Sequence, residues 1–219
     1  MVVSFDYAVH QLSPLTSDRK QLEKAVKQAE IGEYVGTVLR DAVFEVVKRS
    51  LAGIKGRKAV IVLTDGKDHG SYPTTNELLY MLEESDAMVY TVFYKTEFPF
   101  PTFGRGGMRR GFPPGGMGGD SAPRGPMVRR RVREEMDNAD AIEFLTMMSD
   151  VTAGRFYSRE VTDLKKTFKL IADEMRQQYR LGYYPPQNPT TKGTLHKIKV
   201  KVAHQDMVVR SRTTYRSKV

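Results

Sequence analysis

Asp65 is the residue with the clearest potential for chemistry in this 219-residue chain. It directly follows the run Ala59 to Thr64, in which Val, Ile, Val and Leu stand together without alternation. Such a run is typical of a strand buried on both faces of a parallel sheet. Gly66 allows a sharp turn just after it. Because ligands of open α/β sheets bind at the carboxyl ends of the strands, Asp65 is the first candidate for a functional carboxylate.

The composition excludes several kinds of site. The chain has no cysteine, so disulfides, thiolate metal sites and cysteine nucleophiles are excluded. Its four histidines are scattered over unrelated segments: His10, His69, His196 and His204. No nucleophile and base stand at motif spacing, and no glycine loop of the phosphate-binding kind occurs. We therefore expect a protein without catalysis. No apolar run is long enough to span a membrane, and the first residues show no signal-peptide pattern.

The basic charge is concentrated in one low-complexity segment, residues 96–136. Residues 105–133 hold eight arginines and one acidic residue, Asp120, whereas the formal net charge of the whole chain is +9. Glycine and proline dominate the segment and no apolar periodicity survives, so we predict a disordered insertion. Arg-Gly steps with interspersed Phe residues are similar to tails that bind RNA or other polyanions. The alternative is a solvated loop without a ligand.

Elsewhere strands and helices alternate, which predicts an α/β fold with a mostly parallel, Rossmann-like sheet covered by helices on both faces. The expected strands are Val2 to Phe5, Ala8 to Leu12, Ala59 to Thr64, Met88 to Tyr94 and Gly154 to Tyr157. Five helices are expected. The first starts at Ser17, the second runs from Thr37 to Leu51, and the third follows the capping box of Thr74 and Glu77. The fourth runs from Asn138 to Thr152, and the fifth is an amphipathic helix that contains Leu164, Phe168, Ile171 and Met175.

The C-terminal residues predict antiparallel strands instead. Tyr179 to Tyr184 is expected to be a strand, with its tyrosines Tyr179, Tyr183 and Tyr184 packed on a sheet. Leu195 to Val202 alternates apolar residues with lysines, and Met207 to Thr213 is expected to pair with it. We therefore divide the chain into a domain of residues 1–184, interrupted at 96–136, and a C-terminal β extension of residues 185–219.

The ordered motifs VVSFD, PLTSDR, GTVLRDA, VIVLTDG, IADEMRQQYRLGYYP and HKIKVKV resemble the bacterial von Willebrand factor type A-related domains, especially those common in acidobacteria. The resemblance covers nearly the whole chain outside the insertion. It implies a Rossmann-like domain that binds protein partners, often through a divalent cation at the carboxyl edge of the sheet. It also implies an extracytoplasmic location.

In that family the cation is Mg²⁺, which takes six hard oxygen ligands. By the resemblance, Thr37 within GTVLRDA and Asp65 within LTDG match two of the ligand positions. The family's first loop, Asp-x-Ser-x-Ser, has no counterpart here, so the metal site is incomplete and no cofactor is expected for this chain alone; Mg²⁺ belongs to a longer form. From the residues alone, Thr37 could instead cap the following helix, and Asp65 could accept backbone N–H groups of its own turn.

The missing motif implies that the family's first, central strand is also missing, as in an N-terminally truncated fragment. That strand would lie between Val2 to Phe5 and Ala59 to Thr64. We expect the sheet to close by direct pairing of these two strands, with self-association as a consequence of the narrower sheet. The alternative is an apolar groove that another strand must fill.

Three function classes follow. The leading one is a non-catalytic, protein-binding adhesion or scaffold domain. The second is RNA or polyanion binding through residues 105–133. The third is a metal-dependent or phosphoryl-transfer enzyme centred on Asp65, which would require further acids on neighbouring strand ends, where only Asp6 is found.

Overall fold

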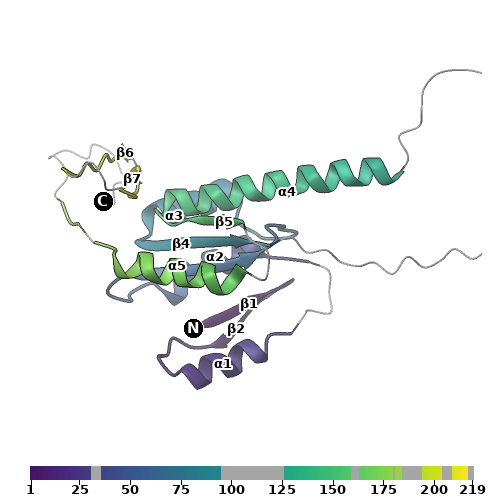
Figure 1. Ribbon diagram of the computed structural model, residues 1–219, viewed down its shortest axis with the longest axis horizontal. Helices are drawn as coiled ribbons and strands as arrows, with labels where there is room; N and C mark the ends of the chain where they lie inside the picture. Colours follow the sequence, from purple (N-terminus) through teal and green to yellow (C-terminus); the bar gives the residue numbers. More distant parts are fainter. Residues whose placement is uncertain are drawn as a thin grey trace, which may run out of the picture.

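A parallel three-stranded sheet forms the centre of the protein. The computed structural model describes residues 1–30, 36–94, 126–158, 163–179, 181–183, 194–203 and 209–216, with the side chains of residues 126–135 left aside. The strands are β3 (Lys58–Thr64), β4 (Ala87–Phe93) and β5 (Phe156–Ser158), in the order β3-β4-β5. Helices cover both faces (Figure 1). The predicted α/β class is confirmed.

One face of the sheet carries the larger part of the core. It is covered by α2 (Leu39–Glu45), its π-helical continuation η1 (Val46–Ser50), α3 (Thr75–Glu84) and α4 (Pro126–Val151). The side chains of Leu39, Leu78, Leu82, Leu145 and Met148 are fully buried there. On the other face, α5 (Leu164–Arg176) places Ile171 against Met88, Tyr90 and Val92 of β4. The strict alternation of β4 residues between the two clusters shows that this strand is buried on both sides.

The N-terminal residues form a separate hairpin. β1 (Val2–Phe5) pairs antiparallel with β2 (Val9–Ser13), and α1 (Arg19–Lys27) follows. Asp18 precedes α1 as its N-cap and accepts the N–H groups of Lys20 and Gln21. The expected direct pairing of Val2 to Phe5 with Ala59 to Thr64 is wrong, because β1 and β3 belong to different sheets. Instead, Val3 and Phe5 of β1 pack against the hydrophobic core that includes Leu39 and Val43 of α2.

Two helix boundaries differ from expectation. The helix predicted to start at Asn138 begins at Pro126, so the last residues of the segment predicted as disordered are helical; residues 96–125 lie outside the described residues. From Pro126 to Val151 the sequence holds no glycine and many good helix formers, and proline is favoured in the first turn of a helix. The second difference is that α2 begins at Leu39, with Val38 rather than Thr37 at the N-cap. The predicted capping box of Thr74 and Glu77 is confirmed.

The C-terminal residues form a small antiparallel pair, β6 (Leu195–Lys197) with β7 (Thr214–Arg216). The partner strand therefore lies at Thr214–Arg216, just after the expected Met207 to Thr213. The N–H of Ile198 still donates to the carbonyl of Thr213 at 2.7 Å. No strand forms at residue 179 or at 181–183, and Tyr179 is 88% exposed. Tyr183 nevertheless packs on a strand as expected, because its ring meets the ring of Tyr215 in β7 edge to face, at 5.8 Å between the ring centroids.

Arginines hold this pair to the end of α3 and the start of β4. Arg212 donates to the carbonyls of Glu83 and Ala87 at 3.3 and 3.1 Å, and Arg216 bonds to the carboxylate of Glu83. Cations are favoured at a helix C-terminus, where carbonyl groups lack partners. Among the described helices, none combines the length and the apolar character required to cross a membrane.

Candidate functional site at the carboxyl edge of the sheet

Three loops meet where β1 and β3 end. The N–H of Val38 donates to the carbonyl of Asp6, just after β1, at 2.7 Å. The N–H of His69, in the loop after β3, donates to the carbonyl of Thr37 at 2.8 Å. These two backbone bonds tie the loop before α2 to both of its neighbours. The structure thus brings the loops of Thr37 and Asp65 together at one edge.

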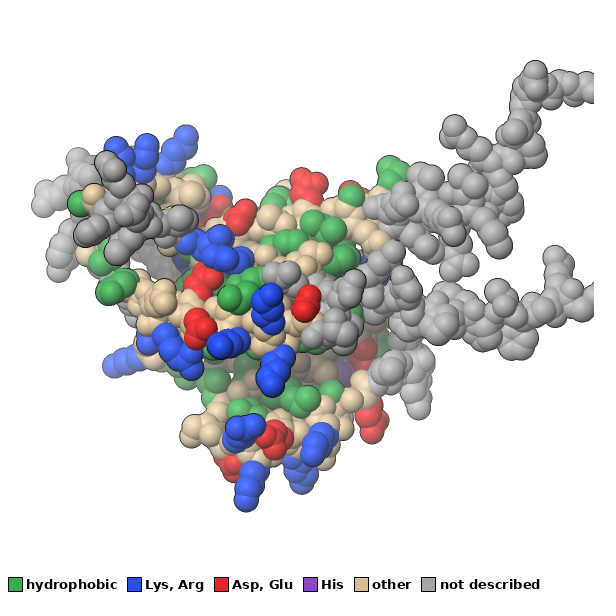
Figure 2. Space-filling model, in the orientation of Figure 1, with side chains coloured by type: hydrophobic (Ala, Val, Ile, Leu, Met, Phe, Trp, Pro, Cys, Tyr) green, Lys and Arg blue, Asp and Glu red, His purple; other side chains and the backbone are tan. Residues whose placement is uncertain are grey.

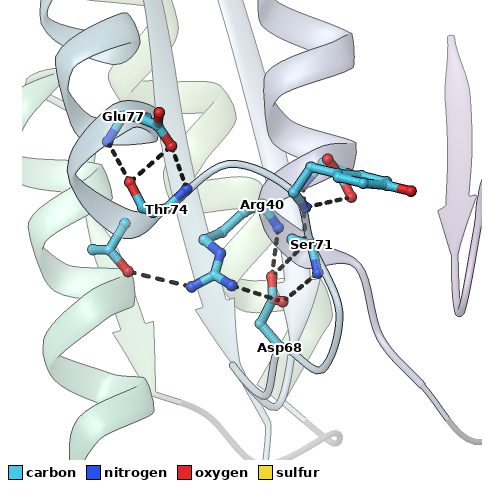
Figure 3. Close-up of polar contacts among 8 residues, drawn as sticks. Arg40, Asp68, Ser71, Thr74 and Glu77 are labelled. Carbon is cyan, nitrogen blue, oxygen red and sulfur yellow. Dashed lines mark hydrogen bonds and ion pairs between the residues drawn. The ribbon is translucent and has the colours of Figure 1, made fainter.

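Asp68 is the central side chain of this edge (Figure 3). Its carboxylate accepts the N–H of Arg40 at 2.8 Å and the hydroxyl of Ser71 at 2.7 Å. The guanidinium of Arg40 lies 3.3 Å from the other carboxylate oxygen, and the Asp68 side chain is only 7% exposed. A carboxylate at a helix N-terminus satisfies N–H groups that have no partner within the helix. Asp68 therefore caps α2 from a loop 28 residues away in the sequence.

The loop after β3 is also tied to α2 and α3 by further bonds. Ser71 Oγ accepts the N–H of Asp41 at 3.2 Å, and the Asp41 carboxylate accepts the N–H of Tyr72 at 3.2 Å. Arg40 also reaches the hydroxyl of Thr75, the first residue of α3, at 3.4 Å. These bonds explain why Thr37 is not needed as a cap. They give the loop a fixed shape without using the side chain of Thr37.

Asp65 forms the turn that its sequence predicts. Its carboxylate accepts the N–H of Lys67 at 3.2 Å, and the Lys67 ammonium lies 3.8 Å away. Burial and the charge of Asp65 raise the pKa of Tyr94, which follows β4. Gly66 has φ +74°, and a Cβ added there would lie 2.6 Å from Cβ of Ala141. Glycine is therefore required both for the turn and for the close approach of α4.

Asp6 occupies the corresponding place after β1. Burial opposes ionisation of its carboxyl, but hydrogen bonds from the N–H of Ala8 and from the ring of His10 outweigh it and lower the pKa of Asp6. The carboxylate thus holds the hairpin turn between β1 and β2. Asp6 resembles Asp65 in this respect, since both accept backbone N–H groups of the turn in which they lie.

An open pocket of about 340 Å³ lies between the loop after β3 and the middle of α4. Its charged lining consists of Arg40, Lys67, Asp68, Asp137 and Asp140. Both signs of charge are present, and Asp68 and Arg40 already satisfy each other. A surface of this kind suits contact with a polar protein surface better than enclosure of a small substrate.

The residues at this edge do not fit an octahedral magnesium site. Among the described residues, no three Asp, Glu or His side chains gather closely enough to hold a metal ion. Asp68 lies in the same loop as Asp65 but directs its oxygens to Arg40 and Ser71. No local pattern predicts this network, because Arg40 and Asp68 are 28 residues apart and no motif links them. Asp6 and Asp65, by contrast, are visible in the sequence, because each directly follows an expected strand.

Comparison with known proteins shows the fold alone. No protein-family model matches the chain, and no curated protein sequence matches it. The fold is similar to the crystal structure of an aerotolerance-related membrane protein from Bacteroides fragilis, with a TM-score of 0.51, 17% identity, and coverage of 80% of this chain and 78% of that one. An uncharacterized membrane-spanning protein from Vibrio fischeri aligns over 78% of this chain and 74% of that one, with 15% identity and a TM-score of 0.31. A score this low is no basis for a statement about the fold.

Proposed function

We propose that the chain is a non-catalytic protein-binding domain of the von Willebrand factor type A kind, and that the carboxyl edge of its sheet is the contact surface. The observation that carries the proposal is the pair of backbone bonds, Val38 to Asp6 and His69 to Thr37, which joins three loops into one surface of fixed shape. Preorganised loops on a rigid scaffold favour binding, because little conformational entropy is lost on association.

The ordered sequence motifs and the α/β fold support the family assignment. The fold of the Bacteroides fragilis protein agrees with it, although a likeness at 17% identity supports the architecture only. The family assignment brings the expectation of a protein partner and of an extracytoplasmic location. Both expectations are part of this proposal.

The bonds of the carboxylates favour binding over catalysis. A general base must reach a nucleophile or a substrate proton. At this edge Asp68 serves Arg40 and the N-terminus of α2, and Asp65 serves the N–H of Lys67. A metal-dependent or phosphoryl-transfer reaction centred on Asp65 would need a second acid beside it. Asp6 is engaged with Ala8 and His10 instead.

Magnesium has at most a small role in this proposal. Thr37 and Asp65 are the two residues that match ligand positions of the family, and the fit of the remaining described residues is poor. We propose that partner binding by this chain does not depend on a divalent cation. A longer form that supplied further oxygen ligands would bind Mg²⁺.

The test compares two aspartates on the same helix. Asp140 lines the pocket at the carboxyl edge, whereas Asp150 is exposed near the other end of α4. The immobilised full chain is used to capture proteins from an extract of its source organism, and the retained proteins are identified by mass spectrometry. We expect Asp140→Lys to lose specific partners that Asp150→Lys keeps, with the same result in EDTA and in Mg²⁺. Equal retention by both variants, or turnover of phosphate esters in Mg²⁺, would contradict the proposal.

The second candidate function is polyanion binding by residues 105–133, which contain eight arginines. Most of this segment lies outside the described residues, so the composition alone supports it. About seven neutralised phosphates give a salt dependence with a slope near −5 for single-stranded RNA. A flat salt titration of RNA binding excludes this candidate and leaves the carboxyl edge untouched.

A further inference from the structure

The C-terminal β extension is a second concentration of positive charge in this chain. Residues 185–219 hold eight lysines and arginines but a single acid, Asp206. Outside this extension and residues 105–133, the chain carries a net negative charge. The described parts of the extension, 194–203 and 209–216, contain no acid. A strongly basic patch attached to an acidic body indicates contact with an anionic partner.

The arginines of the extension are occupied by the body of the protein. Arg212 and Arg216 bind the end of α3 and the start of β4. The guanidinium of Arg216 also lies 4.3 Å from the centre of the Tyr80 ring. Arg210 donates to the carbonyl of Gly154, just before β5, at 3.0 Å. These contacts fasten the pair of β6 and β7 to the body, so the arginines serve to hold the extension in place.

The lysines of the extension have no such structural role. Lys197, Lys199 and Lys201 are exposed, whereas Ile198 and Val200 between them are partly buried. No described carboxylate forms an ion pair with any of the three lysines. Because alternate residues of an extended chain lie on the same side, about 7 Å apart, the three ammonium groups form a row along β6 and the residues that follow it. This row is available to an external anion.

Exposed apolar side chains accompany the lysine row. Leu195, on the same side of β6 as Lys197, is 45% exposed, and Val202 at the other end of the row is also 45% exposed. Tyr183, whose ring meets Tyr215 of β7, is 55% exposed. Lysines flanked by aliphatic and tyrosine side chains suit the interface of an anionic membrane, where both kinds of side chain find partners. A nucleic acid would neutralise the lysines but leave the aliphatic side chains in water, so the membrane is the better fit.

The extension lies away from the candidate contact surface. Arg212 reaches Ala87, the first residue of β4, which places the extension at the amino edge of the sheet. In Figure 1 β6 and β7 lie at the end of the sheet where β4 begins, and in Figure 2 blue side chains gather over the same region. A surface bound at this end leaves the loops at the carboxyl edge open to a protein partner.

We propose that the C-terminal β extension docks on the surface of an anionic phospholipid membrane. Lys197, Lys199 and Lys201 bind the lipid phosphates, and Leu195 and Val202 enter the layer between the headgroups and the acyl chains. The arginines keep the extension fixed to the body, so that the carboxyl edge points away from the membrane. This contact is distinct from the function proposed above and does not depend on it.

The test measures co-sedimentation of the full chain with vesicles. Vesicles of equal parts phosphatidylcholine and phosphatidylglycerol are compared with vesicles of phosphatidylcholine alone. We expect the chain to bind the anionic vesicles at least about tenfold more tightly, and added salt to weaken this binding. A lysine near an anionic membrane surface contributes about fivefold in affinity. Joint replacement of Lys197, Lys199 and Lys201 by Gln should therefore weaken binding about a hundredfold.

Matched variants separate the extension from charge and apolar surface elsewhere. Joint replacement of Lys20, Lys24 and Lys27 by Gln removes the same charge from the exposed side of α1 and should weaken binding less than about threefold. Leu195→Ser should weaken binding about fivefold, whereas Leu170→Ser, at a leucine of α5 that is 42% exposed, should leave it unchanged. The lysine variants should melt at the temperature of the wild type, because these side chains lie at the surface.

Three results would overturn the proposal. One is the absence of a preference for the anionic vesicles. Another is an equal loss of binding in the two lysine variants, which would assign the attraction to net charge or to residues 105–133. The third is tighter binding to polyuridylate than to vesicles, with dependence on the lysines of the extension and none on Leu195, which would assign the lysine row to a nucleic acid. Asp140→Lys tests the carboxyl edge and should leave vesicle binding intact; its loss there would also contradict the proposal.

Discussion

β3 and β4 are neighbouring strands of seven residues each, and they are very differently buried. Every residue of β4 is buried, whereas only Val62 and Thr64 are buried in β3. The compositions are similar, so the difference comes from the surroundings. β4 has a strand on each side, while β3 has one only on the β4 side among the described strands. An apolar run therefore shows that a strand can be buried on both faces, but its neighbours decide whether it is.

The largest loss of stability is predicted for substitution of Gly154, which lies just before β5 and against β4. A Cβ added to Gly154 would lie 1.9 Å from the carbonyl oxygen of Val89 in β4. Backbone at this distance cannot yield without displacing β4 or β5. We expect Gly154→Ala to lower the free energy of unfolding by about 4 kcal/mol, measured by urea denaturation. Gly53→Ala meets no neighbouring atom and should cost only about 1 kcal/mol through its positive φ. Equal effects would show that the β4–β5 side is not tightly packed.

The second prediction compares two valines that face each other in register, Val60 of β3 and Val89 of β4. Val89 is fully buried and Val60 only partly. We expect Val89→Ala to cost about 2.5 kcal/mol and Val60→Ala about 1 kcal/mol, because the cavity at Val60 is open to solvent. A larger loss at Val60 than at Val89 would mean that β3 is covered in solution, for example by self-association. Sedimentation of the wild-type chain would identify that case.

The sequence predicted the elements that depend on local pattern. The strands around residues 59–64 and 88–94, the amphipathic α5 and the capping box of Thr74 and Glu77 all follow from periodicity and end signals within a few residues. The class of fold follows from their alternation. These features depend on interactions between residues close in the sequence, which a single sequence displays directly.

The features that were missed depend on partners far away in the chain. The cap of α2 by Asp68 joins residues 28 positions apart, and Thr37 looked like the cap because it stands next to the helix. The expected pairing of β1 with β3 is wrong because Val3 and Phe5 of β1 pack against the core that includes α2, and the hydrogen-bond partner of β1 is β2. No strand forms at residue 179 or at 181–183 either, because tyrosines favour strands only where the backbone also finds hydrogen-bond partners on a neighbouring segment, which a local pattern does not reveal.

A smaller change in stability is predicted for substitution of Tyr90, which packs against Ile171 of α5. Its ring is fully buried, and its hydroxyl has no partner among the described residues. Tyr90→Phe removes this unsatisfied group, so we expect a gain of about 1 kcal/mol in the free energy of unfolding. Tyr72→Phe, at a tyrosine that is 95% exposed, is the control and should change nothing. A loss of stability in Tyr90→Phe would show that the hydroxyl is hydrogen-bonded.

The same residue predicts a dependence on alkaline pH. Burial raises the pKa of Tyr90 to about 12, and the charge of Glu174 adds to the shift. Because the folded state holds this proton more tightly than the unfolded state, the contribution to stability is complete below pH 10 and is lost as the pH rises from 10 towards 12. Thermal denaturation between pH 9 and 12 should show a steeper loss in the wild type than in Tyr90→Phe. Parallel curves would refute this contribution.

The smallest effect is expected from magnesium. If the ion bound tightly, it would reduce the difference in stability between β3, which has one neighbouring strand among the described strands, and β4, which has two. An ion held by Asp65 after β3 and by oxygens of the loops around Thr37 and Asp6 would fasten the N-terminal hairpin to the sheet, and the exposed side of β3 would become more stable. Asp68 cannot join such a shell without releasing Arg40 and the N-terminus of α2, which would leave a guanidinium and two N–H groups without their partners. We therefore expect calorimetry to detect no binding at micromolar Mg²⁺ and the melting temperature to be unchanged by EDTA. Micromolar affinity that disappears in Asp65→Ala but persists in Asp150→Ala would contradict this expectation, and would make the carboxyl edge a metal-dependent contact surface.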